Sequence, residues 1–499
     1  MRKILSALIC VMMIVSLFAL GVSADGEPTL ITDAAQFAAM DPDGNYKLGA
    51  DITITASYAT FNGIFDGDGH TVTVSAPMFE RITGTVKNLV IEGEVTGTGT
   101  SEHVAPLALR GSGTAILISN VTNKAKVTTA YRAAGIISQI DNNAVAVIEH
   151  CTNYGDVTNT GEASSMLGGI IGYQQGLTLT IFNCVNYGKI TSAYGLAGGI
   201  MGRFGGDYAY SAERSITIKN CLNAGDVTAT TQTAGILAYG LGSNVTIQNC
   251  TNSATILETY KSDGSQGGSQ ACGIFGATQS KDGYYCIVNI SKCLNEGDIT
   301  SVNGHGGGIA GYVWCGSYSG TYMYAVLTDC VNKGTVKGGS FASQFLTYTN
   351  DTKGMEEGEK QPTTVTGVGL GNVGRAAEAT RTEDKFYASF VGLSSSNKAT
   401  NYNVDVKVAD TDVSTYFAYS EGTEANRVPI QDAPAGYQIV SVADAGAAAA
   451  AIELLGYQAP EIPDPDDNPT TGDSAVWFAI AGAVALLGTA VTFKACKSR

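Results

Sequence analysis

The sequence predicts an all-β protein whose main part is a parallel β-helix solenoid with three strands per coil. A phrase of seven residues recurs six times between residues 151 and 337, with a cysteine, an asparagine two positions later and a β-branched residue six positions later. The cysteines are separated by 33, 37, 29, 43 and 37 residues, the length of one supersecondary unit stacked on similar neighbours. Apolar and polar residues alternate around each phrase, and no helical period appears. This pattern is typical of stacked β coils.

Each repeat contains three expected strands. In the repeat of Cys184, Leu179 and Ile181 precede the cysteine with the period of two that marks a strand with one buried face. Ile190 begins a second strand after a turn, which usually has glycine four positions after the cysteine, and we expect positive φ there. The segment GGIMG at 198–202 and its equivalents predict a tight corner leading into a third strand.

The six repeated cysteines are predicted to be buried thiols that act as small hydrophobic residues. Equivalent Cβ atoms in stacked strands lie about 4.8 Å apart, outside the range of about 3.5–4.5 Å that a disulfide needs. The disulfide state of Cys272, Cys286 and Cys315, which lie off the repeated position, is left open. The repeated cysteines are Cys151, Cys184, Cys221, Cys250, Cys293 and Cys330.

The repeated asparagines are predicted to form a structural ladder at a corner of the coils. Stacked amides can hydrogen bond from coil to coil, and asparagine tolerates the left-handed conformation that corners use. A row of ligand-binding asparagines is the alternative. The residues are Asn153, Asn186, Asn223, Asn252, Asn295 and Asn332.

Weaker copies of the repeat, headed by Leu89 and Val121, extend the predicted solenoid over residues 84–340. Residues 25–83 are predicted to form an N-terminal cap and the first coils. Residues 341–458 contain β-like runs and form either a cap on the open end or a small separate β domain. Residues 459–467 are rich in proline and aspartate and are predicted to be a stiff linker.

Both ends of the chain carry sorting information. Residues 1–24 have two basic residues, an apolar run and a small-residue cleavage site, which predicts a secretory signal peptide; an uncleaved anchor is the alternative. At 468–499, Asn468, Pro469, Thr471 and Gly472 precede an apolar stretch and a basic tail. This order resembles the Gram-positive sortase signal that usually begins with leucine. The resemblance implies cleavage after Thr471, sortase as a partner and covalent attachment to peptidoglycan. A C-terminal membrane anchor is the alternative.

The opening segments YKLGADITI and FNGIFDGDGHTVTV (61–74), together with the GGIxG segments, resemble the pectin-lyase-like surface proteins, particularly the GLUG-motif group. The resemblance covers about residues 28–340 and implies a right-handed β-helix. It does not imply one function, because lyases, glycosidases, adhesins and structural rods share this fold.

Charge and motifs exclude several function classes. The net charge of −16 becomes −20 when the charged residues of both sorting segments are removed, and such a chain repels nucleic acid. No histidine or cysteine spacing matches a metal site, and no cofactor is expected. Asp66 and Asp68 alternate with glycine before His70, which predicts a structural turn; calcium binding or catalysis there is the alternative.

One group of residues stands out as a candidate binding patch. Tyrosine-rich insertions follow the third segment of several coils and are expected to project from one edge, where aromatic side chains commonly bind ligands. We therefore predict an adhesin or display protein for glycan or protein ligands. A polysaccharide lyase or glycoside hydrolase is the first alternative, and a stalk without ligand is the second. The patch comprises Tyr208, Tyr210, Tyr284, Tyr285, Trp314, Tyr318, Tyr322 and Tyr324.

Overall fold

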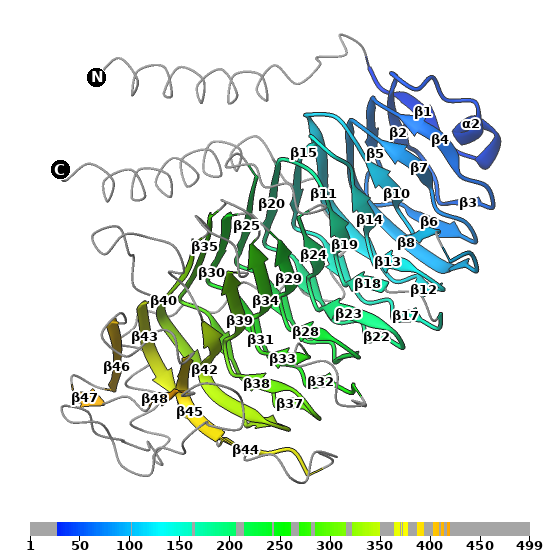
Figure 1. The fold of residues 1–499 in the computed structure, drawn as a ribbon. Coiled ribbons are helices and arrows are strands. Elements are labelled where there is room, and N and C mark those ends of the chain that lie inside the picture. Colours follow the sequence, from blue (N-terminus) through cyan, green and yellow to red (C-terminus); the bar gives the residue numbers. More distant parts are fainter. Residues whose placement is uncertain are drawn as a thin grey trace, which may run out of the picture.

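A computed structural model describes residues 27–419, except 101, 162–164, 206–213, 242–243, 261–268, 281–284, 316–321, 350–363, 370, 372, 378–386, 394–402, 409–410 and 414–416. The predicted signal peptide, linker and sorting segment lie outside these residues. Within them, no helix is long and apolar enough to span a bilayer. The described strands stack along one axis as an all-β parallel solenoid (Figure 1).

The coil of Cys184 shows how the chain is wound. It contains β20 (Thr178–Phe182), β21 (Val185–Asn186), β22 (Ile190–Ser192), β23 (Gly195–Gly198) and β24 (Met201–Phe204). Each pairs in parallel with its equivalent in the next coil. The strands form three ladders: β20 and β21 belong to the first, β22 to the second, and β23 and β24 to the third. The expected three faces are present, but two of them are bent, so a coil has five strands rather than three.

The lumen of the solenoid is filled with apolar side chains. Leu179, Ile181, Cys184, Ile190 and Phe204 of this coil are all fully buried. Their alternation along the strands is the period of two seen in the sequence, and burial of the apolar face stabilises the stack. The ladders therefore present only their outward side chains to a ligand.

The stack begins before the repeats that the sequence marks. β1 (Thr29–Ile31) pairs with β2 (Asn45–Leu48), β2 pairs with β5 (Ile64–Asp66), and β5 pairs with β8 (Thr85–Gly97). A short helix, α2 (Ala34–Ala38), lies at this end (Figure 1). Its Phe37 packs edge-on against Phe65, with the ring centroids 5.9 Å apart.

The stack also continues past residue 340. β42 (Phe341–Thr349) pairs in parallel with β38 (His305–Gly307) and β39 (Ala310–Cys315) of the preceding coil and with β45 (Tyr387–Leu393) of the following one. β46 (Asn403–Val408) and β47 (Thr411–Val413) form an antiparallel pair at this end. The described strands after 340 thus belong to the same stack as the repeats.

Two expectations about backbone conformation are wrong. The left-handed residue is not the repeated asparagine but the residue before each cysteine, such as Asn183 and Asn220, both with φ of 52°. The glycine four positions after the cysteine does not have positive φ. A methyl group on Gly188 or Gly225 would overlap a carbonyl oxygen of the preceding coil, so close approach of neighbouring coils explains the glycine.

Candidate functional site

The repeated asparagines form one continuous buried ladder. Each donates a hydrogen bond from Nδ2 to Oδ1 of the next, as in Asn186 to Asn223 and Asn223 to Asn252, both 2.8 Å. The ladder begins one coil earlier than the phrase, at Asn123, and ends where Asn332 donates to Gln344 Oε1 at 2.6 Å. These asparagines are fully buried, and each ends a strand at a corner of the coil, where an amide also donates to the carbonyl oxygen two residues on, as from Asn186 to Gly188 at 2.9 Å. Because the amides satisfy one another and no ligand can reach them, the ladder is structural.

The ladder explains the glycines of the GGIxG segments. A methyl group on Gly199 would overlap the Asn223 amide and the carbonyl oxygen of Gly235. The same relation joins Gly169 to Asn186 and Gly235 to Asn252 in neighbouring coils. The repeated asparagine and the glycine of the GGIxG segment therefore belong to one contact, in which the asparagine amide packs against the glycine backbone.

The repeated cysteines are free, buried thiols. The Cys250 thiol donates a hydrogen bond to the Gln248 carbonyl oxygen at 3.3 Å, and the carbonyl oxygen of Ile218 in the preceding coil is a second acceptor at 3.6 Å. Burial raises the pKa of Cys330 to about 12. Cys272 is also a free buried thiol. The side chains of Cys286 and Cys315 lie outside the described part of the chain.

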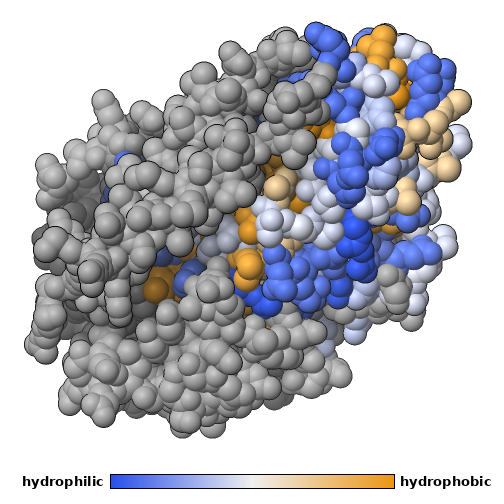
Figure 2. Space-filling model, turned by 90° about the horizontal axis from the view of Figure 1, so that it is seen from above, coloured by the Kyte–Doolittle hydropathy of each residue, from blue (hydrophilic) through white to orange (hydrophobic). Residues whose placement is uncertain are grey.

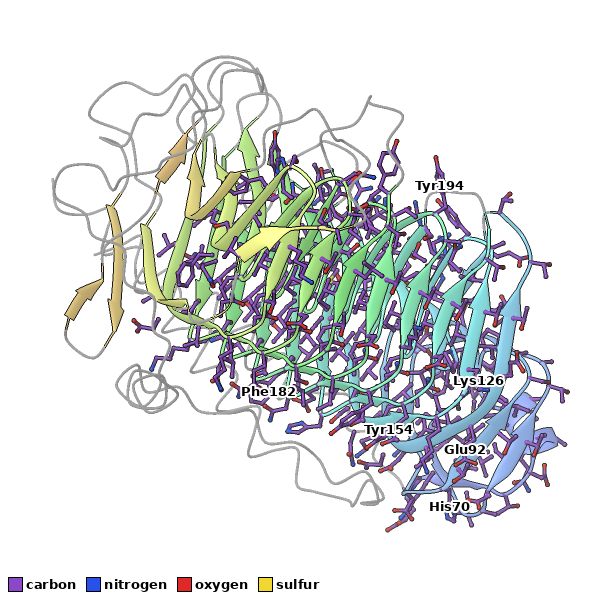
Figure 3. All side chains as sticks on the ribbon, turned by 90° about the horizontal axis from the view of Figure 1, so that it is seen from below. His70, Glu92, Lys126, Tyr154, Phe182 and Tyr194 are labelled. Atoms are coloured by element: carbon purple, nitrogen blue, oxygen red, sulfur yellow. The ribbon has the colours of Figure 1, made fainter. Side chains whose placement is uncertain are left out.

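The Asp66–His70 segment is a tight turn held by its own carboxylates. Asp68 and Gly69 have φ of 50° and 82°, and Asp66 Oδ1 accepts a hydrogen bond from the Asp68 backbone at 2.9 Å. Lys87 and Lys47 neutralise Asp66 and Asp68 at 3.2 and 2.8 Å. His70 lies at the surface, on the side opposite Tyr194 (Figure 3). Across the described residues, no group of three or more histidine, cysteine or acidic side chains is arranged to hold a metal ion.

The predicted tyrosine patch is described only in part. Tyr285 begins β35 (Tyr285–Ser291), Tyr322 and Tyr324 lie in β40 (Tyr322–Asn332), and Trp314 lies in β39. Tyr285 and Tyr322 are register partners on adjacent coils. The backbone thus places these residues in strands rather than in loops. Their side chains, together with the whole of Tyr208, Tyr210, Tyr284 and Tyr318, lie outside the described residues.

A cavity with both charged and apolar lining residues lies on the outer side of the third ladder, near the N-terminal end of the solenoid. Its volume is about 470 Å³, within the usual range of about 300–1,000 Å³ for small-molecule sites. It is formed by β4 (Tyr58–Phe61), β7 (Phe79–Ile82), β9 (His103–Val104), β10 (Ala108–Gly111) and the end of β8. The charged and titratable lining residues are Glu80, Arg81, Glu102, His103 and Arg110.

Two arginines of this cavity share one carboxylate. Arg81 and Arg110 are register partners on adjacent coils. Asp141 accepts a hydrogen bond from Arg81 Nη1 at 2.6 Å, whereas Arg110 Nη1 is 3.7 Å from its other oxygen. Gln139 Nε2 also donates to Asp141, at 2.9 Å. One carboxylate thus faces both guanidinium groups, while Glu80 and Glu102 add negative charge elsewhere in the lining.

His103 connects the cavity to a stack of cations and aromatic rings. Burial and the neighbouring Arg110 and Arg132 lower the pKa of His103 to about 4, so its ring is neutral at pH 7. Nδ1 of His103 is buried without a hydrogen-bond partner among the described residues. The guanidinium of Arg132 lies 4.5 and 4.6 Å from the ring centroids of Tyr131 and Tyr173.

This cavity was not predicted from the sequence. Its charged residues are spread over residues 80–110 and match no motif spacing. The signal that could have found it is the coil register, because Arg81 and Arg110 occupy the same position in consecutive coils and face outward there. Glu80 and Glu102 both line the cavity, so two acids are present in it, as the hydrolase alternative requires.

The rest of the described surface offers few apolar docking sites. Leu30 and Tyr194 are its exposed large hydrophobic residues, at 55% and 54%. Seen from above, the described surface is mainly hydrophilic, with hydrophobic residues in small separate areas (Figure 2). The cavity is therefore the described feature best suited to bind a ligand, and its lining offers charged side chains beside apolar ones.

Comparisons with known proteins place few constraints on function. No family model matches the chain, and no curated protein matches it. Among solved structures, the chain is similar to a Bacteroides ovatus protein provisionally named an immunoglobulin A1 protease, whose crystal structure was solved at 1.30 Å resolution. The two share 20% sequence identity with a TM-score of 0.40, and the match covers 52% of this chain and 85% of the other. A similarity this low supports no argument about fold or function.

Proposed function

We propose that this chain is an extracellular surface protein whose right-handed β-helix, of the GLUG-motif type, binds a glycan in the Arg81–Arg110 cavity. The observation that carries the proposal is the convergence of two arginines, two glutamates and a neutral histidine in one cavity of about 470 Å³. Sugars are bound by such planar, charged hydrogen-bonding groups because these match hydroxyl groups in pairs. The signal sequence at 1–24 and the sorting segment at 468–499 support display on the cell wall by sortase.

The test uses cells that display the full chain. We expect labelled glycans from an array to bind these cells, and replacement of Arg81 and Arg110 by alanine to abolish that binding. Lys337→Gln, which removes one exposed charge at the far end of the solenoid, is the control and is expected to bind normally. A second variant, with Trp314, Tyr318 and Tyr322 changed to alanine, tests the tyrosine patch independently. If no glycan binds, the rod is a stalk or binds protein, and the proposal fails.

A glycoside hydrolase at the same cavity is the second candidate, because Glu80 and Glu102 both line it. A hydrolase uses one carboxyl group as acid and the other as base or nucleophile. Incubation of any bound glycan with the full chain would release smaller sugars, and Glu80→Gln and Glu102→Gln would each stop the release. Binding without release assigns the cavity to recognition alone.

A further inference from the structure

We propose that the cavity selects a sugar unit that carries one anionic group, a carboxylate or a sulfate ester, on an otherwise uncharged glycan. This inference rests on the proposed function and names the ligand class of the same site. It follows from how the charges are arranged within the cavity and not only from their presence.

The two arginines of the cavity are suited to a single anion. Asp141, with 17% of its side chain exposed, is hydrogen bonded to Arg81 and Gln139 and is therefore a fixed counterion. Arg110 is too far from it, at 3.7 Å, for a hydrogen bond, and 41% of the Arg110 side chain is exposed. The Arg110 guanidinium thus has donors in the fork geometry that binds a carboxylate or sulfate with two hydrogen bonds.

Neither Arg132 nor His103, which lie near Arg110, can bind the anion in its place. Arg132 lies between the Tyr131 and Tyr173 rings, which hold its guanidinium against an aromatic face. His103 is neutral at pH 7 and adds no positive charge. The ligand therefore meets Arg110 as a cation without a hydrogen-bonded counterion, next to Arg81, whose side chain is 36% exposed but is hydrogen bonded to Asp141.

The acidic groups of the cavity disfavour a polyanion. Glu80 and Glu102 line the same space, and Glu102 is held in place by accepting a hydrogen bond from the Gly99 backbone at 2.8 Å. A chain with an acid on every sugar would bring carboxylates toward these two groups and toward a protein of net charge −16. Uncharged sugars instead offer hydroxyl donors to both glutamates. One anion next to neutral sugars is the arrangement that complements all of these charges.

The experiment compares four fluorescent probes on cells that display the full chain. They are an oligosaccharide ending in N-acetylneuraminic acid, the same chain without that sugar, the same chain with a terminal sulfate ester, and a uronic acid tetramer. We expect one of the singly charged probes to bind at least tenfold more tightly than the uncharged one. Arg110→Gln should remove that difference, Arg110→Lys should restore part of it, and Lys337→Gln should leave it unchanged.

The outcomes separate this inference from the function on which it rests. Equal binding of the charged and uncharged probes, with loss of both in the Arg81 and Arg110 alanine variant, refutes the selection of an anion but leaves glycan binding in place. Tighter binding of the uronic acid tetramer refutes the selection of a single charge. Failure of every probe and every array glycan overturns both proposals. A thermal melt of each purified variant confirms that it is folded.

Discussion

A carboxyl group buried in the wall of the solenoid should contribute stability in acid that is lost as the pH rises to neutral. Glu258 ends β32 (Ile256–Glu258) and is fully buried. It accepts a hydrogen bond from Ser301 Oγ at 2.7 Å and another from the Tyr260 backbone N–H. These bonds do not offset desolvation, and burial raises the pKa of Glu258 from 4.5 to about 7.

The magnitude follows from that pKa. In the unfolded chain Glu258 ionises near pH 4.5, whereas in the folded chain it stays protonated until about pH 7. The contribution of Glu258 to the free energy of unfolding is therefore fully present below about pH 4.5, falls as the pH rises toward 7 and is constant above it. Each pH unit corresponds to about 1.4 kcal/mol, so the folded state loses about 3 kcal/mol over this interval.

The assay is urea unfolding of the purified chain between pH 4 and 8, compared with Glu258→Gln. Glutamine keeps the size and stays neutral, so the variant should lose this part of the pH dependence. Glu149, whose pKa is also raised by burial, is present in both proteins and cancels in the comparison. Parallel pH profiles for the two proteins would refute the reasoning.

Three further predictions concern the coil contacts. Asn223→Ala leaves a donor on Asn186 and an acceptor on Asn252 unsatisfied. Urea unfolding should therefore show a free energy of unfolding lower by at least about 2 kcal/mol. The control Asn289→Ala, at an outward position, should change it little. Gly199→Ala should cost about 1–3 kcal/mol because its methyl group overlaps Asn223, whereas Gly240→Ala, with its nearest neighbour at 3.4 Å, should be tolerated; equal melting temperatures would contradict this. Cys330, with a pKa of about 12, should resist alkylation by iodoacetamide at pH 8 until the chain unfolds. Mass spectrometry of the peptide that contains Cys330 measures the alkylation. Rapid labelling of the native chain would contradict the prediction, because it would show that the thiol is accessible.

The sequence was sufficient for the repeat and insufficient for the conformation within it. The apolar residues Leu179, Ile181 and Ile190 predict strands, because the alternation of apolar and polar residues shows directly which side chains face the lumen. The left-handed position before the cysteine does carry a signal, because asparagine tolerates positive φ and occupies it at Asn183, Asn220 and Asn249, but His150 and Lys292 interrupt the row. The bends that divide a coil into five strands depend on contacts with neighbouring coils.

The candidate site shows the same limit more strongly. The tyrosine patch was chosen because its residues cluster along the sequence, whereas Arg81, Arg110 and Asp141 meet only because consecutive coils place them side by side. The composition of any one segment of the sequence does not predict this contact between coils. Once the register is known, such rows can be found by comparing equivalent positions of successive coils.

The asparagine ladder has a consequence for how the rod can change in length. Every rung from Asn153 to Asn295 donates toward the next coil and accepts from the previous one, so these rungs are interchangeable. Removal of a whole coil, such as residues 221–249, would leave Asn186 facing Asn252 with donor and acceptor still matched. Duplication of a coil would preserve the match in the same way. Gain or loss of part of a coil would break the chain of amides, so the ladder favours length variation in whole coils.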